Sequence, residues 1–184
     1  MNNKNKARLP ARRGFTLVEL LIYIATFSFV LVFLVSFVLN LIGVQAKIRI
    51  NKEVLENNQR AMETILSYVK ESQDIYTSTS YFDNHPGQLS LKTAQDTPEG
   101  EEITYLDFYL DENERICFKE EGSEAIALTS EKIRINNMTF NYLIDSNNNK
   151  SIRIELSAVY RDSGNKINYQ ATSTLISTAN LRND

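Results

Sequence analysis

The stretch RRGFTLVE at residues 12–19, with the apolar run that it opens, decides the fold of this chain. The apolar run extends to residue 44 and contains one charged side chain, that of Glu19. A helix over residues 15–44 would be about 45 Å long, whereas about 20 residues suffice to cross the hydrocarbon core of a bilayer. The sequence therefore predicts a membrane-spanning helix over residues 15–44, whose outer end leaves the bilayer.

The order of these residues resembles the prepilin motif of the type IV pilin and type II secretion pseudopilin superfamily. That motif is a basic leader, a Gly, a Phe, a short apolar stretch and a Glu five residues after the Gly. Gly14, Phe15 and Glu19 stand at the corresponding places, and Thr16, Leu17 and Val18 complete the pattern.

The resemblance implies a processing pathway for the amino terminus. A prepilin peptidase would recognise the basic leader, residues 1–14, through Arg12 and Arg13. It would cut between Gly14 and Phe15 on the cytoplasmic side of the membrane. The new amino group of Phe15 would then be N-methylated.

The residue types suit this chemistry. Gly14 has no Cβ, so its backbone can adopt an extended geometry that a protease cleft can hold. Glu19 lies one helical turn after Phe15, so its carboxylate can face that amine or the same amine on a neighbouring chain. A carboxylate in lipid costs about 2 to 3 kcal/mol or more. We therefore expect Glu19 to set the register of an incoming subunit during assembly.

Three other interpretations of the amino terminus remain open. A secretory signal peptide has an apolar core of about 7 to 15 residues and a small-residue cut site, for which residues 44–46 could serve. The pair Arg12-Arg13 also resembles a twin-arginine signal, although Ala11 precedes it and no Lys follows Phe15. In an ordinary single-pass anchor, Glu19 would lie at the membrane interface without a role in assembly.

The composition excludes several classes of function. About 110 residues remain for a head domain after the leader and the long helix, too few for a large two-domain enzyme. Removal of the leader, which carries five cations and no acid, lowers the formal net charge from −3 to −8. Such an acidic chain is unlike a nucleic-acid-binding protein.

Cys117 is the single cysteine, so no intrachain disulfide forms, and we expect it in a strand as a small apolar residue.

After residue 44 the pattern becomes amphipathic over residues 45–75, without Pro or Gly. We predict one helix from Phe15 to about Gln73, half in lipid and half packed on a head domain. The apolar face is expected to contain Ile48, Val54, Leu55, Met62, Ile65, Leu66 and Val69.

The head domain, residues 76–184, is predicted to be rich in strands. Residues 76–100 resemble a variable polar loop with one strand-like piece at 88–92. Residues 103–110 and 115–119 form a predicted hairpin around 111–114, and residues 151–161 alternate between apolar and polar. Further strands are expected at 125–129, 133–135, 138–144 and 167–176. The fold class is α+β, a long helix on a mostly antiparallel sheet, as in pilins.

No catalytic, metal-binding or cofactor-binding group is predicted. His85 is the only histidine, so one chain cannot build a His-based triad or a multi-His metal site. Asp145, Asn147 and Asn149 have the spacing of a calcium loop, but Lys150 replaces the required Gly and Leu156 the required Glu.

The carboxyl half has a second resemblance, at residues 128–130, 133–142 and 181–183, to minor pseudopilins of the J type and related minor pilins. We therefore expect a minor subunit that assembles through its helix into a type IV pilus or a type II secretion pseudopilus, at the tip or in initiation. Expected partners are the prepilin peptidase, other subunits and an inner-membrane assembly platform, with a cytoplasmic leader and an extracytoplasmic head. The alternative is a single-pass membrane-anchored binding protein or enzyme, which would keep its amino terminus.

Overall fold

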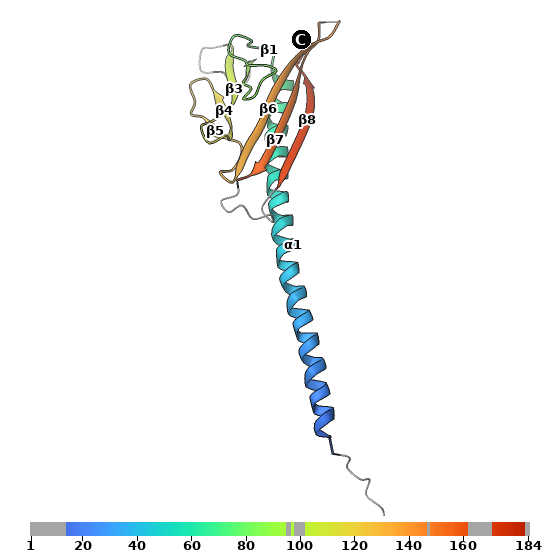
Figure 1. Ribbon diagram of the computed structural model, residues 1–184. Coiled ribbons are helices and arrows are strands. Elements are labelled where there is room, and N and C mark those ends of the chain that lie inside the picture. The colour runs from blue at the N-terminus through green and yellow to red at the C-terminus, as the bar shows by residue number, and fades with distance from the viewer. Residues whose placement is uncertain (1–13, 95–96, 98–101, 147, 162–170, 183–184) are drawn as a thin grey trace, which may run out of the picture. The chain divides into compact units, whose positions relative to one another are not determined.

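The computed structural model describes residues 14–94, 97, 102–146, 148–161 and 171–182. The chain divides into two compact units, Met1–Gly43 and Val44–Asp184. Helix α1, Leu17–Glu71, is continuous in backbone hydrogen bonding and contributes residues to both units (Figure 1). The prediction of one long helix is confirmed, with a start two residues later and an end two residues earlier than expected.

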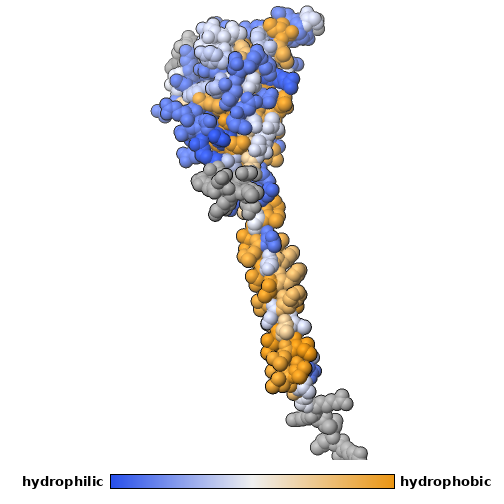
Figure 2. All heavy atoms as spheres, viewed as in Figure 1, coloured by the Kyte–Doolittle hydropathy of each residue, from blue (hydrophilic) through white to orange (hydrophobic). Residues whose placement is uncertain are grey.

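In the first unit, α1 presents apolar side chains in every direction. From Leu17 to Ile42 every residue is exposed, and the surface of this segment is mostly hydrophobic (Figure 2). A helix that is apolar all round is typical of a lipid-buried segment. By length and composition, α1 is the one described helix that could cross a membrane.

In the second unit, α1 buries one stripe of side chains. Its members recur three or four residues apart, as expected for one helix face. They are Ile50, Val54, Asn57, Asn58, Ala61, Met62, Ile65 and Val69. The predicted face was wrong at two positions, because Ile48 is 60% exposed and Leu55 is 41% exposed. Leu55 lies about 100° around the helix from Val54, so its side chain lies beside the buried face and not on it. The buried position about one turn after Val54 is occupied by Asn58.

The first sheet is antiparallel and has the strand order β1-β2-β3-β4-β5. Its strands are β1 Asp74–Ile75, β2 Leu89–Thr93, β3 Thr104–Leu110, β4 Ile116–Glu120 and β5 Ile126–Ala127. The predicted hairpin is confirmed, since Leu110 pairs with Ile116 across residues 111–115. In this turn Glu114 adopts a positive φ of 55° and its N–H donates to the Asp111 carbonyl.

The second sheet is also antiparallel, with the order β6-β7-β8. Its strands are β6 Ile133–Ile144, β7 Lys150–Tyr160 and β8 Thr172–Asn180. The two strands expected at 133–135 and 138–144 are one strand, interrupted by a bulge between Ile135 and Asn137. The last strand continues to Asn180, four residues beyond its predicted end. Ala171, also predicted in this strand, lies outside it. Residues 167–170 of the predicted strand and the predicted turn 162–165 lie outside the described residues.

One hydrophobic core lies beneath both sheets and the buried stripe of α1. The alternation predicted for β7 is confirmed, because Ile152, Ile154, Leu156 and Ala158 are fully buried. The expectation of a single sheet was wrong. The short β5 and the segment after it end the first sheet, and β6 begins a second one (Figure 1).

Candidate processing and assembly site

A side-chain cap fixes the start of α1. The Glu19 N–H donates to the Thr16 hydroxyl oxygen at 3.2 Å, so Thr16 is the N-cap and Leu17 the first helical residue. Residues 16–19 have the Thr-x-x-Glu spacing of a capping box. The cap explains why α1 begins at Leu17 and not at Phe15.

The predicted cleavage position lies just before this cap. Gly14 and Phe15 are outside the helix and exposed, so their peptide bond is sterically accessible. A Cβ on Gly14 would meet no atom within 4 Å, so the fold itself does not require glycine there. The Phe15 ring lies 5.7 Å from that of Tyr23 and is 72% exposed. Arg12 and Arg13, the predicted recognition residues, lie outside the described residues.

Glu19 is the only charged residue between Leu17 and Gly43. Two other polar side chains of this segment bond to their own helix: Thr26 Oγ1 donates to the Ile22 carbonyl at 2.9 Å, and Asn40 Nδ2 donates to the Ser36 carbonyl at 3.1 Å. Within the described part of the chain, no hydrogen bond or ion pair reaches the Glu19 carboxylate.

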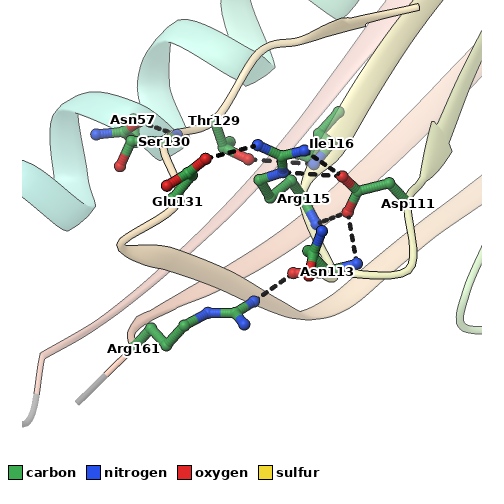
Figure 3. A network of polar contacts seen from close by, with 9 residues as sticks. All are labelled: Asn57, Asp111, Asn113, Arg115, Ile116, Thr129, Ser130, Glu131 and Arg161. Atoms are coloured by element: carbon green, nitrogen blue, oxygen red, sulfur yellow. Dashed lines mark hydrogen bonds and ion pairs between the residues drawn. The ribbon is translucent and has the colours of Figure 1, made fainter. Parts of the chain in front are cut away.

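The second unit contains a polar network around Asp111 (Figure 3). The Asp111 carboxylate accepts hydrogen bonds from the backbone N–H groups of Asn113 at 2.9 Å and Arg115 at 2.8 Å. It also accepts a hydrogen bond from Arg115 Nε at 2.8 Å and forms an ion pair with Arg115 Nη2 at 2.8 Å. Burial alone would raise the pKa of the Asp111 carboxyl, but these bonds and the Arg115 charge outweigh it and lower that pKa.

The same network connects the β3–β4 turn to α1. Arg115 lies 3.8 Å from the Glu131 carboxylate, and the Ser130 N–H donates to the Asn57 side-chain oxygen at 3.0 Å. Arg161 donates to the Asn113 carbonyl. These contacts hold the segment that crosses from the first sheet to the second, so the network is structural in character (Figure 3).

We predict that Asp111 makes the stability of the head depend on pH. Because the folded pKa of Asp111 lies below its ordinary value of 3.8, its contribution is present above that value, begins to fall near pH 5 and is lost as the pH falls through the folded pKa. Asp111→Asn should therefore lower the melting temperature at pH 7 and reduce its decline between pH 5 and pH 3.

Glu112→Gln is the matched control for this prediction, because Glu112 is an exposed carboxylate in the same turn. It should melt like the parent at every pH. The melting temperature is measured by circular dichroism at each pH. If it falls equally with pH in Asp111→Asn and in the parent, Asp111 is not the source of the pH dependence.

An open groove of about 430 Å³ lies on the first sheet. Tyr76 and Tyr105 form its aromatic part, with ring centroids 5.0 Å apart, and Asp107, Lys119 and Glu121 are among its polar lining residues. The Asp107 carboxylate accepts a hydrogen bond from the Ser90 hydroxyl. The groove could hold a small polar molecule.

Two polar residues have structural roles that the sequence did not predict. Asn58 is fully buried, and its Nδ2 donates to the Ser173 carbonyl at 3.0 Å, 115 residues away. His85 is exposed, as expected for a loop, but its Nδ1 accepts the Met138 N–H at 3.0 Å. Neither pairing leaves a signal in the local sequence.

Cys117 is buried in β4 as predicted, and burial raises the pKa of its thiol.

Within the described residues, no group of three or more His, Cys, Asp or Glu side chains could hold a metal ion. Asp145 and Asn149, from the calcium-like spacing, belong to the β6–β7 turn, where the Asp145 N–H donates to the Asn149 carbonyl at 3.1 Å. Asn147 lies outside the described residues.

Comparisons with protein-family models, with curated proteins and with solved structures found no match to this chain.

Proposed function

We propose that this chain is a minor subunit of a type IV pilus or a type II secretion pseudopilus, with a prepilin-type amino terminus. A prepilin peptidase would remove residues 1–14, Phe15 would be N-methylated, and the mature helix would enter a filament bundle. The head would contact other subunits at the tip or during initiation. Such a subunit has an assembly role and no reaction of its own.

The observation that carries this proposal is the environment of Glu19. A charge at the start of an apolar segment is costly in lipid, and the other polar groups noted in this segment bond to their own helix. Glu19 lies in the first turn after an accessible Gly14–Phe15 bond, where the amine produced by cleavage would also lie. An amine from a neighbouring chain is a partner of the right charge.

The α+β layout also supports the proposal. The same helix that is apolar all round in the first unit buries a stripe of eight side chains in the second.

The decisive experiment is the amino-terminal mass of the protein recovered from membranes. We expect a chain that begins at N-methylated Phe15. A chain that retains Met1, or one that begins at Lys47, would contradict the proposal.

Gly14→Val should abolish this cleavage and leave membrane insertion unchanged. The added side chain meets no atom of this chain within 4 Å, so its effect would come from crowding in the protease cleft. Ala11→Val, with the same bulk three residues earlier, is the control and should still be cut. Normal cleavage of Gly14→Val would refute the assigned cut site.

The groove beside Tyr76 and Tyr105 favours one second candidate, a single-pass membrane-anchored binding protein or enzyme. Such a protein would retain its uncut amino terminus. The mass measurement above therefore separates the two candidates.

A further inference from the structure

A row of three polar side chains crosses the first sheet on the face that points away from the core. Ser90 of β2 lies opposite Asp107 of β3, and Asp107 lies opposite Lys119 of β4. Leu106 and Phe108, on either side of Asp107 in the chain, are buried in the core, so Asp107 points to the other face of the sheet. Asp107 and Lys119 both line the groove on this sheet.

A chain of hydrogen bonds orients the Asp107 carboxylate. The Thr79 hydroxyl donates to the Ser90 hydroxyl oxygen at 2.8 Å, and the Ser90 hydroxyl donates to Asp107 Oδ1. Ser90 is 1% exposed, so this chain is shielded from water and the carboxylate is held in one orientation. Asp107 and Lys119, both among the described residues, form no ion pair with each other although they are cross-strand neighbours. Each therefore keeps its charge for a molecule in the groove.

Two tyrosine rings give the groove an apolar wall. The ring centroids of Tyr76 and Tyr105 lie 5.0 Å apart, with an angle of 58° between the ring planes. Tyr76 is 41% exposed, so part of its ring can contact a ligand. The segment that carries Tyr76 is tied to β2, because the Tyr76 N–H donates to the Ser90 carbonyl at 2.9 Å and the Ser80 hydroxyl accepts the Ser90 N–H at 3.0 Å. The fold itself thus fixes this wall.

The charges of the groove select the chemistry of its ligand. A carboxylate only accepts hydrogen bonds, whereas an ammonium group only donates them. A simple cation would be attracted by Asp107 and repelled by Lys119. A simple anion would be repelled by Asp107 and Glu121, which both line the groove. Two neighbouring hydroxyl groups match both charges, because one can donate to Asp107 while the other accepts from Lys119.

A sugar ring combines such a pair of hydroxyl groups with an apolar face. Its C–H bonds can pack on an aromatic ring while the hydroxyl groups at its rim form hydrogen bonds. The volume of about 430 Å³ lies within the range of about 300 to 1,000 Å³ that is usual for small-molecule sites.

We propose that this groove binds a neutral saccharide. One sugar ring would pack on Tyr76, and two neighbouring hydroxyl groups of that ring would bond to Asp107 and Lys119. The Ser90 hydroxyl would act as a positioning group, since it orients Asp107 from beneath the sheet surface. The proposal concerns the second unit alone and does not rest on the filament function.

Saturation-transfer NMR with the full chain tests this proposal. The chain is kept in a detergent without a sugar head group. The probes are the methyl glycosides of glucose, galactose, mannose and N-acetylglucosamine, together with cellobiose and maltose. We expect transfer from the protein to the ring protons of at least one probe. Absence of transfer to all of them, or transfer to glycine or choline and to none of the sugars, would overturn the proposal.

Two variants connect binding to the groove. Tyr76→Ala removes the exposed ring and keeps the backbone N–H, and Lys119→Met replaces the ammonium group by an apolar chain of similar length. Each should weaken the affinity for the bound sugar about tenfold or more, the loss expected when a hydrogen bond to a charged group or an aromatic contact is removed. Because neither side chain is buried, the melting temperature should stay near that of the parent. Unchanged affinity in both variants would refute the groove as the binding site.

Tyr81→Ala and Lys47→Met are the matched controls. Both replace exposed residues of the same types that do not line the groove. They should bind the sugar like the parent. An equal loss of affinity in the controls would refute a specific role of the groove.

This set of tests is independent of processing at the amino terminus. Sugar binding by a chain that retains its leader would support the groove and contradict the filament function. Cleavage after Gly14 in a chain that binds no probe would do the reverse.

Discussion

A chain that begins at Thr77 is expected to be unfolded, whereas a chain that begins at Gln45 is expected to be soluble and folded. The longer chain keeps the buried stripe of α1, which includes Val54, Ile65 and Val69 at 1% exposure or less. Each fully buried aliphatic side chain contributes about 1.5 to 3 kcal/mol. Domains of this size are stable by only about 5 to 15 kcal/mol, so loss of the stripe should be decisive.

The measurements are circular dichroism and the dispersion of amide NMR signals for the two fragments. Two matched variants of the longer fragment test the same surface without truncation. Ile65→Asp buries a charge in the core and should unfold the fragment. Leu55→Asp changes a residue of similar apolar character that is 41% exposed, and it should be tolerated. A folded Thr77 fragment would refute the role of α1 in the core.

The second large effect is expected for Glu19. Glu19→Val removes a costly charge from the apolar segment, so the variant should enter the membrane at least as well as the parent and still be cut after Gly14. Its incorporation into filaments should nevertheless be lost, because the amine of the incoming chain no longer meets a carboxylate. Crosslinking of subunits in membranes measures incorporation into filaments separately from cleavage after Gly14.

Thr26→Val is the matched control, since Thr26 is a polar residue of the same segment whose hydroxyl bonds to its own helix at 2.9 Å. It should assemble normally. Assembly of Glu19→Val as efficient as that of the parent would show that Glu19 does not set the subunit register.

Local sequence patterns were sufficient for the elements themselves. The apolar run and the amphipathic pattern after it predicted α1 to within two residues at each end, because neither stretch contains a Pro that would end the helix. Alternation predicted the buried face of β7, and the polar turn at 111–114 predicted the β3–β4 hairpin. At the candidate site, the order of Gly14, Phe15 and Glu19 was visible from the sequence, whereas the Thr16 cap was not predicted.

Tertiary structure alone decided how these elements combine. Periodicity could not show that Asn58 is buried and Leu55 exposed, because the bonds of Asn58 go to Ser173, 115 residues later. Nor could it show two sheets in place of one, since their separation depends on the crossing segment held by Asn57 and Ser130. The outer edge of β6 has the same origin, because Glu114 and His85 bond to it from distant parts of the chain. Local sequence does not encode such contacts.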